Sequence, residues 1–222
     1  MIVAIDGPAA SGKSTVAKAV ARRLHATYLD TGAMYRAVAA LALQRGIDLD
    51  DATELGALAA AEPVSFAPSD GDGVLNRVLI AGTDVTHTIR TPQVDAAVSR
   101  VARIALVRSA MLGRQRELGA TGLSVVEGRD IGTTVFPDAE VKIYLTASAD
   151  ERARRRHKDL TGAGHELDAS MVRERLERRD AADSSREASP LAIADDAFAL
   201  DTTGLDVEQV VDRIVQRVEA AR

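Results

Sequence analysis

The stretch Gly7-Pro8-Ala9-Ala10-Ser11-Gly12-Lys13-Ser14-Thr15 decides the fold of this chain. It has the spacing G-x-x-x-x-G-K-[ST] of a phosphate-binding loop, between an apolar run at Ile2–Ile5 and a helical pattern from Val16 onward. The glycines let successive backbone N–H groups face one anion, and the helix start adds partial positive charge. Lys13 is expected to reach the β- and γ-phosphates, and Ser14 to bind Mg²⁺. All of residues 7–15 are predicted to bind a nucleoside triphosphate, ATP or GTP, and the flanking strand and helix disfavour a chance match.

The composition indicates one sizeable α/β core. The 222 residues are 46% apolar and 3% aromatic, and without cysteine they offer neither a disulfide framework nor a thiolate metal site. A net charge of −5 disfavours a general nucleic-acid binder. No apolar stretch reaches the length of about 18 residues that spans a membrane, and a core strand at the N-terminus leaves no room for a signal peptide. A cytoplasmic protein without nucleic-acid or membrane partners is predicted.

Hydrophobic periodicity predicts short strands alternating with helices, which is typical of a parallel sheet covered on both faces. The predicted strands are 2–5, 26–29, 123–126, 141–145 and 198–200, and the predicted helices are 13–24, 31–45, 51–61, 92–118, 148–160, 168–186 and 206–220. Thr31 is expected to cap its helix, and Gly46 to end it. Residues 63–91 lack a helical period and contain the turn signal Asp70–Gly73, so a compact β-rich insertion is expected there.

Acidic and basic residues follow the strand predicted at 123–126. In an open parallel sheet, ligands bind beyond the carboxyl ends of the strands. Glu127 is therefore a candidate carboxylate near Mg²⁺, with an exposed loop acid as the alternative. The neighbouring Arg129 and Asp130 are placed to hold an acceptor, although alone they could form a surface ion pair worth about 0–1 kcal/mol.

Arginines are abundant between residues 152 and 186. Arg179, Asp183 and Arg186 are four and three residues apart, which places them on one helix face. Arginine suits phosphate through its planar fork, while helix-supporting ion pairs are the alternative explanation. Arg152 and the run Arg154–Arg156 precede a glycine-containing loop at 161–165 and are interpreted as part of a mobile cover. The histidines form no catalytic arrangement and are expected at the surface: His25, His87, His157 and His165.

Several motifs in this chain resemble those of the bacterial cytidylate kinases, which are nucleoside monophosphate kinases with a phosphate-binding loop. The matching stretches, in the same order nearly end to end, are Ile5–Ser14 (IDGPAASGKS), Leu29–Arg36 (LDTGAMYR), Thr91–Val94 (TPQV), Glu127–Ala139 (EGRDIGTTVFPDA) and Arg178–Arg186 (RRDAADSSR). The resemblance implies transfer of the γ-phosphoryl group of ATP to CMP or dCMP, with Mg²⁺, in pyrimidine nucleotide metabolism.

The same resemblance implies an α/β fold with a P-loop NTPase-type core, in which helices flank a parallel five-stranded sheet. An enlarged β-containing insert binds the nucleoside monophosphate, and a short lid covers the site. Residues 1–222 then form a single nucleoside monophosphate kinase domain. Its core is expected at 1–62, 92–151 and 171–222, its insert at about 63–91 and its lid at about 152–170.

The resemblance also implies roles for single residues. The residues implied for the acceptor phosphate are Arg36, Arg129 and Arg186. Those implied for the cytosine edge are Ser99, Arg108 and Asp130, and those for the sugar are Arg179 and Asp183. Thr31 stands where relatives often have serine and keeps the hydroxyl. Catalysis is assigned to Lys13, Arg129 and Arg186, ATP binding to the loop and Arg155, and the metal to Ser14 and Glu127.

Ser99 and Arg108 pose a geometric problem, because residues nine apart lie about 180° apart on a continuous helix. Both can face one base only if the helix is interrupted, so a bend is predicted near 103–106. The alternatives to this function are a different small-molecule kinase (adenylate, thymidylate or shikimate kinase), a nucleotide switch and a nucleic-acid-binding ATPase. No Asn/Thr-Lys-x-Asp guanine motif supports the switch. A monomer is predicted, given the long insert.

Overall fold

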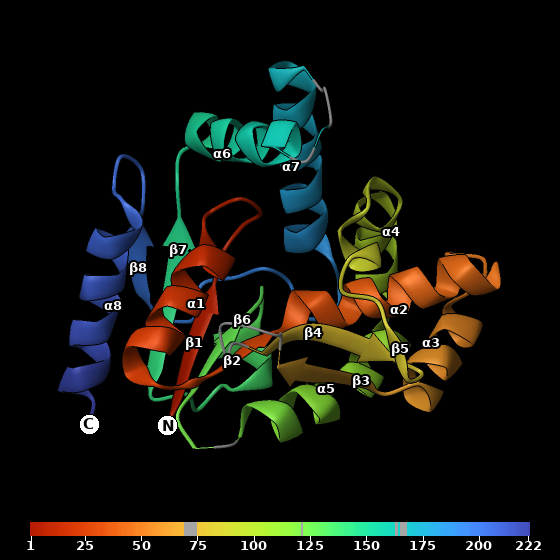
Figure 1. Ribbon diagram of the computed structural model, residues 1–222, viewed down its shortest axis with the longest axis horizontal. Helices are drawn as coiled ribbons and strands as arrows, with labels where there is room; N and C mark the ends of the chain where they lie inside the picture. Colours follow the sequence, from red (N-terminus) through yellow and green to blue (C-terminus); the bar gives the residue numbers. More distant parts are fainter. Residues whose placement is uncertain (69–74, 121, 163, 165–167) are drawn as a thin grey trace.

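A five-stranded parallel sheet organises the structure, which is a computed structural model describing residues 1–68, 75–120, 122–162, 164 and 168–222 (Figure 1). Its strand order is β2-β6-β1-β7-β8, and every neighbouring pair is parallel. The strands are β1 (Ile2–Asp6), β2 (Thr27–Asp30), β6 (Ser124–Glu127), β7 (Val141–Thr146) and β8 (Phe198–Asp201). The predicted sheet is confirmed, with strand ends shifted by a residue or so. The expected turn at 70–73 and His165 lie outside the described residues.

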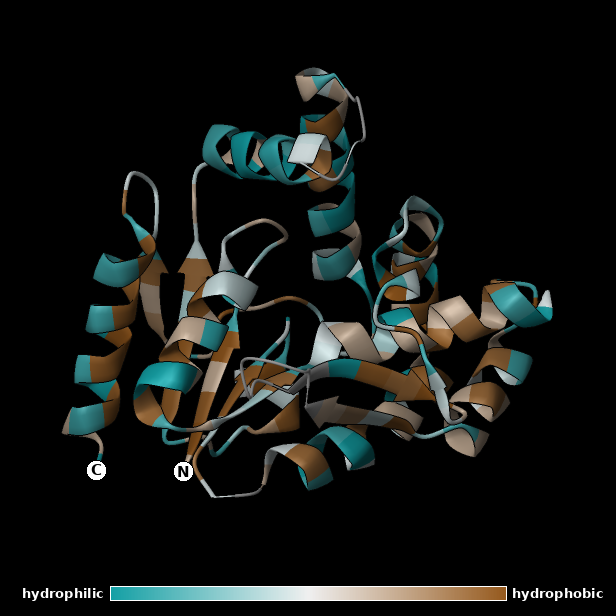
Figure 2. Cartoon of the chain, in the orientation of Figure 1, coloured by the Kyte–Doolittle hydropathy of each residue, from teal (hydrophilic) through white to brown (hydrophobic). Residues whose placement is uncertain are grey.

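The two faces of this sheet are covered by different helices. Val3 and Ile5 of β1 are buried against α1 (Lys13–Leu24) and α8 (Val207–Ala220). Ala4 points to the opposite face and packs with Ile131 in the single π-helical turn η2 (Ile131–Val135) and with Leu112 of α5 (Ala105–Gly119). This alternation follows from the two-residue period of a strand. Figure 2 shows the brown apolar side of α8 facing the sheet and its teal side facing outward.

A second hydrophobic cluster forms around α2 (Thr31–Arg45), beside the main sheet. It includes α3 (Ala52–Ala61), α4 (Pro92–Ala102) and η1 (Thr88–Arg90), together with an antiparallel sheet of β3 (Val64–Pro68), β4 (Leu75–Ile80) and β5 (Thr83–Asp84). Val64 and Ile80 are fully buried in this cluster. The β-rich character expected for 63–91 is therefore confirmed, whereas its boundaries as a substrate-binding insert stay a prediction.

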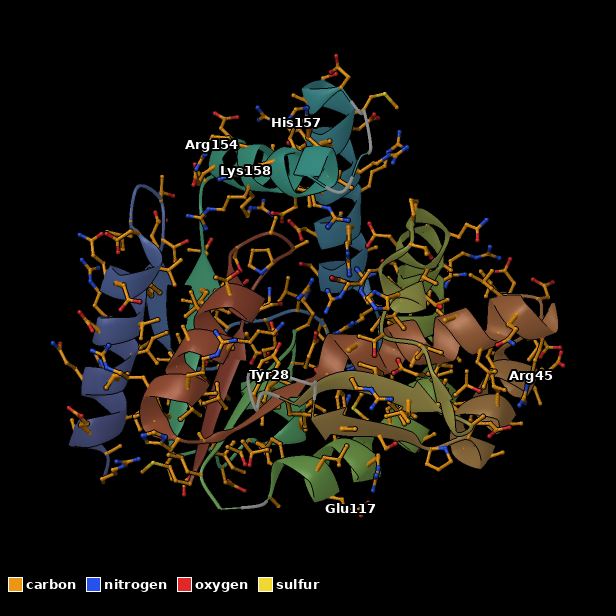
Figure 3. The ribbon with its side chains drawn as sticks, in the orientation of Figure 1. Tyr28, Arg45, Glu117, Arg154, His157 and Lys158 are labelled. Atoms are coloured by element: carbon orange, nitrogen blue, oxygen red, sulfur yellow. The ribbon has the colours of Figure 1, made fainter. Side chains whose placement is uncertain are left out.

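Helices α6 (Ala149–Gly162) and α7 (Ala169–Ser185) lie together at the end of the molecule that also holds the phosphate-binding loop (Figure 1). Helix α7 also contacts α4, so chain segments far apart in sequence surround one region. Figure 3 places Arg154, His157 and Lys158 on α6, well away from Glu117 on α5. Among the described helices, none combines the length and apolar character needed to cross a bilayer.

Two local predictions for the helices have opposite outcomes. The bend near 103–106 is confirmed, because α4 ends at Ala102 and α5 begins at Ala105. Thr31 as the cap of α2 is wrong. The carboxylate of Asp30 instead accepts a hydrogen bond from the backbone of Ala33 at 2.9 Å, as a capping side chain does. The Thr31 hydroxyl, in the first helical position, donates to the Glu127 carbonyl at 2.7 Å.

Candidate active site

The phosphate-binding loop joins β1 to α1, with Gly7 at φ +148° and Gly12 at φ +92°. The Lys13 ammonium is buried and donates to the Pro8 carbonyl at 2.6 Å and to Ser11 Oγ at 3.3 Å. Burial, followed by the charge of Arg129, holds the pKa of Lys13 well below its ordinary value. The lysine is therefore held inside the loop, where its positive charge would stabilise a bound phosphate.

Gly7 is the glycine of this loop that tolerates a side chain least. A Cβ there would lie 2.0 Å from the Leu145 carbonyl oxygen, which belongs to the backbone of β7, and the φ of +148° disfavours any L side chain. Gly7→Ala is expected to lower the free energy of unfolding by about 3 kcal/mol or more, since a backbone overlap cannot relax cheaply.

The matched control is Gly46→Ala, which also changes a positive-φ glycine but has no atom within 4 Å of the new Cβ. It is expected to cost about 1 kcal/mol. Urea unfolding of both variants measures the difference. Equal losses at the two positions would show that the contact with Leu145 is unimportant.

Glu127 ends β6 beside the loop and is 3% exposed, so the alternative of an exposed acid is wrong. Ser14 Oγ donates to its Oε2 at 2.9 Å, and the Tyr28 hydroxyl donates to its Oε1. Burial and the neighbouring Asp30 raise the pKa of Glu127 to about 7. A hydroxyl and a carboxylate held in contact supply the hard oxygen donors that Mg²⁺ prefers. Within the described ranges no cluster of three or more His, Cys, Asp or Glu could hold a metal ion.

A pocket next to Glu127 brings together eight of the nine residues implied for CMP, drawn from α2, α4, α5, α7, the residue directly after α7 and the segment after β6. These residues are Thr31, Ser99, Arg108, Arg129, Asp130, Arg179, Asp183 and Arg186. The break between α4 and α5 lets Ser99 and Arg108 line the same pocket, although they are nine residues apart. Arg36 does not line it.

Arg108 and Asp130 form a buried ion pair in this pocket, with exposures of the two side chains of 8% and 7%. The reading of Asp130 as half of a surface ion pair is therefore wrong. Arg186 Nη2 approaches the other oxygen of Asp130 at 3.4 Å, and Arg108 lies 5.3 Å from the centre of the Tyr35 ring. Asp130 thus has basic partners on both oxygens.

Two arginines of the pocket keep unused donors. Arg108 Nε and Arg179 Nε are buried and have no hydrogen-bond partner. Burial, followed by the charges of Arg129 and Arg36, lowers the pKa of Arg179 to about 10. Because buried N–H groups are rarely left unpaired in a native protein, these two atoms are available to acceptor atoms of a ligand or of water. The alternative of purely helix-supporting ion pairs does not account for them.

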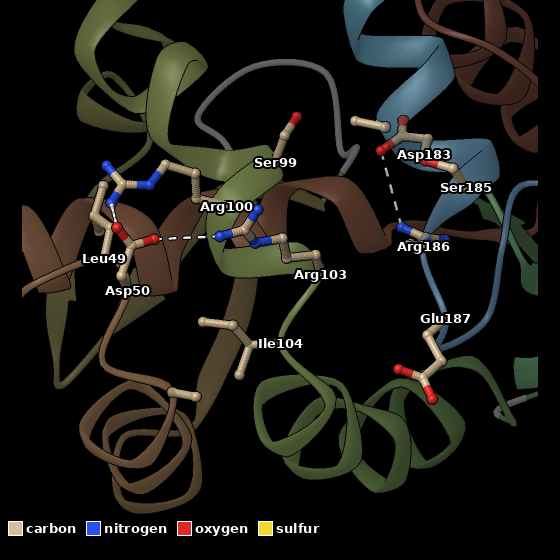
Figure 4. Close-up of a pocket in the computed structure, with 12 residues that line it drawn as sticks. Leu49, Asp50, Ser99, Arg100, Arg103, Ile104, Asp183, Ser185, Arg186 and Glu187 are labelled. Atoms are coloured by element: carbon tan, nitrogen blue, oxygen red, sulfur yellow. Dashed lines mark hydrogen bonds and ion pairs between the residues drawn. The ribbon is translucent and has the colours of Figure 1, made fainter.

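A larger cavity of about 560 Å³ adjoins the pocket and shares Ser99, Asp183 and Arg186 with it. Figure 4 shows Ser99 on one wall and Asp183 and Arg186 on the opposite wall. Arg129 Nε donates to Asp183 Oδ2 at 3.0 Å, so Asp183 is fixed from the side of the loop that follows β6. The two hollows together form one cleft between α4 and the end of α7, and it has room for a nucleotide.

Basic residues of α6 lie against the phosphate-binding loop. Arg155 Nη1 donates to the Ser11 carbonyl at 3.1 Å and to Thr202 Oγ1 at 2.9 Å. Arg152 donates to the Ala9 carbonyl at 3.2 Å and forms an ion pair with Asp180. The prediction that Arg155 binds ATP stays a prediction, and its position beside the loop is compatible with it.

Comparison with known proteins identifies the family. The cytidylate kinase model matches residues 3–220. The chain is 48% identical over 220 residues to the cytidylate kinase of Bacillus licheniformis, covering 99% of this chain and 96% of the relative. It is 50% identical over 216 residues to the cytidylate kinase of Geobacillus kaustophilus, with coverages of 97% and 95%. The chain belongs to the cytidylate kinase family.

The predicted membership in the cytidylate kinase family and the predicted kinase class are therefore confirmed. A solved structure from Eubacterium ventriosum, described as an uncharacterized protein, aligns with 99% of both chains at a TM-score of 0.52 and 11% identity. At that identity it supports the fold alone.

Sequence reasoning missed several residues of this cytidylate kinase site. Tyr28 and Tyr35 support Glu127 and Arg108, and Asp6 accepts from the backbones of Ile131 and Gly132 at 2.8 Å each. Of these residues, only Asp6 could have been found from the sequence, because it lies directly before the phosphate-binding loop. The histidines stay outside the cleft: His25 and His87 are exposed, and His157 is half-buried.

Proposed function

We propose that this chain transfers the γ-phosphoryl group of ATP to CMP or dCMP and releases ADP with CDP or dCDP. The observation that carries this proposal is the buried Arg108–Asp130 pair within a pocket of arginines beside the phosphate-binding loop. Membership in the cytidylate kinase family supports it independently. A phosphate-binding loop alone favours only the binding of one nucleotide. The pocket is the feature that favours the binding of a second nucleotide, one that contains cytosine.

The donor nucleotide is proposed to bind along the loop 7–15. The inward-facing backbone N–H groups and Lys13 hold its phosphates, and Arg155 lies over the same loop. Ser14 and Glu127 are the residues that would hold Mg²⁺. When bound, the metal neutralises phosphate charge.

The acceptor phosphate is proposed to be held by Arg36, Arg129 and Arg186. Two anionic groups must meet in line during transfer, and these guanidinium groups with Lys13 offset their repulsion. Lys13, Arg129 and Arg186 would in this way act as catalytic charges. The acceptor oxygen belongs to an ionised phosphate, so transfer requires no strong general base.

Cytosine is proposed to be selected by hydrogen bonds at one edge of the ring. Asp130 accepts from the exocyclic amino group, while Arg108 and Ser99 face acceptor atoms of the base. Uracil has a carbonyl in place of the amine and would set an acceptor against a carboxylate. The pair Arg179 and Asp183 would contact the sugar. The Thr31 hydroxyl would make the contact that the serine hydroxyl of relatives makes at this position.

Water must be excluded from the transferring phosphoryl group, or ATP would be hydrolysed without an acceptor. We infer that residues 63–91 act as the monophosphate-binding insert and residues 152–170 as the lid, within one domain whose core is 1–62, 92–151 and 171–222. Closure of both over the cleft would exclude water. A monomer is proposed, given the long insert. A cytoplasmic location is inferred from the two nucleotide substrates.

The reaction itself is tested by product analysis. The purified chain is incubated with ATP, CMP and Mg²⁺, and nucleotides are separated by chromatography. CDP and ADP are expected in equal amounts, and EDTA is expected to stop their formation. ADP without CDP would show hydrolysis instead of transfer, and CDP formation undiminished in EDTA would overturn the assigned role of the metal.

A further inference from the structure

Asp95, in the first turn of α4, is the meeting point of three arginines that the proposed mechanism does not pair with it. Its Oδ1 accepts from Arg36 Nη2 at 2.5 Å, and its Oδ2 accepts from Arg156 Nη2 at 2.6 Å. Arg179 Nη1 approaches Oδ1 at 3.5 Å. The arginines come from α2, α6 and α7, so one carboxylate on α4 links α2 to the consecutive helices α6 and α7.

The Asp95 carboxylate is ionised at neutral pH. Burial opposes ionisation, but Arg36, Arg156 and Arg179 outweigh it and lower the pKa of Asp95 to about 2. The side chain is 28% exposed, so the cluster is open to solutes. Asp95 is therefore a fixed anion in contact with solvent at the edge of the cleft.

The Asp95 carboxylate does not supply enough hydrogen-bond acceptors for all three arginines. Its two oxygens are used by Arg36 and Arg156, which leaves Arg179 with a long contact and with a buried Nε that has no partner. A phosphate group carries three acceptor oxygens and nearly two charges. The phosphate of CMP could therefore compete with Asp95 for Arg36, the arginine that is proposed to hold the acceptor phosphate and that is bonded to Asp95 here.

We propose that Asp95 is an internal competitor for the substrate phosphate: in the free enzyme its carboxylate, which also contacts Arg156 and Arg179, occupies Arg36, and the phosphate of CMP displaces it from Arg36. This inference rests on the proposed function for the identity of the displacing ligand. Asp95 then raises the concentration of acceptor needed to fill the site. It leaves the transfer step unchanged, because it has left Arg36 before transfer occurs.

The test compares Asp95→Asn, Asp95→Ala and Asp95→Glu with the unchanged chain. Calorimetry measures the Kd for CMP and for inorganic phosphate, and initial rates give KM and kcat. Both neutral variants are expected to bind CMP and phosphate about tenfold more tightly, with a lower KM for CMP and kcat within about twofold. Asp95→Glu keeps the charge and is expected to stay near the unchanged chain. Asp212→Asn, which removes an exposed partner of Arg23 on α8, controls for the loss of an acidic group elsewhere.

Unchanged or weaker binding by the neutral variants would overturn the proposal, since a carboxylate that merely positions the arginines predicts weaker binding. A crystal structure of the unchanged chain with CMP needs no variant to fold. It is expected to show Asp95 separated from Arg36, and an intact Arg36–Asp95 bond beside bound CMP phosphate would refute displacement. Failure of the unchanged chain to bind or phosphorylate CMP would instead overturn the proposed function, and the phosphate titration would still report on Asp95.

Discussion

Replacing Lys13 by methionine is expected to lower kcat for ATP-dependent phosphorylation of CMP by about three orders of magnitude. The ammonium group is the cation supplied by the phosphate-binding loop itself, and the loop buries it among carbonyl and hydroxyl oxygens. In a site where transfer depends on positioning and charge, removing one such cation costs about 10²–10³-fold or more in rate. Methionine keeps the length and apolar stem of lysine, so the loop retains its packing.

The matched control for Lys13→Met is Arg45→Met. Arg45 is the last residue of α2 (Figure 3), pairs with Glu62 at 2.5 Å and lines neither hollow of the cleft. This variant also removes one positive charge and is expected to keep full activity. Circular dichroism establishes that both variants are folded. A folded Lys13→Met protein with more than a tenth of the original kcat would contradict the assigned role of the loop.

Replacing Asp130 by asparagine is expected to lower kcat/KM for CMP about 100-fold and to change kcat/KM for UMP far less. The Asp130 side chain is 7% exposed, and in the proposed complex its carboxylate accepts from the amino group of cytosine. Asparagine can turn its own amino group toward the base. There it places a donor against the donor of the cytosine amine, but it can donate to the uracil carbonyl. Mismatched groups in a buried polar site cost several kcal/mol.

Loss of the counter-charge to Arg108 and Arg186 also accompanies Asp130→Asn, so the ratio of the two substrates is the informative quantity. Asp196→Asn provides the control, because Asp196 is exposed and pairs with Lys142 of β7, which lies on the other side of β1 from β6 and β2. Equal losses with CMP and UMP would show that Asp130 supports the pocket without reading the base.

The fold could be predicted from local features of the sequence. Ile2–Asp6 is a short β-branched strand, and the phosphate-binding loop that follows fixes the turn into α1. Alternating strands and helices then leave a parallel sheet as the natural arrangement. The break between Ala102 and Ala105 could be predicted for a different reason: two residues on opposite faces of a continuous helix were both needed at one base.

The remaining details depend on contacts between distant segments. Thr31 has the chemistry of a cap, but the neighbouring Asp30 takes that role and leaves the hydroxyl free for the Glu127 carbonyl. Tyr28 reaches Glu127 across the pair β2 and β6, and Asp95 meets arginines of three helices. No local periodicity encodes such pairings, so only the folded structure places these residues in the site.

The most direct test of the central claim is the rate of ADP release from ATP and Mg²⁺ with AMP, CMP, dCMP, UMP, GMP and dTMP offered separately. The Arg108–Asp130 pocket predicts strong turnover with CMP and dCMP and far weaker turnover with the others. Preferred turnover of a purine monophosphate or dTMP would contradict the assignment of Ser99, Arg108 and Asp130 to the base, and no turnover with any of the six would contradict the proposed function itself.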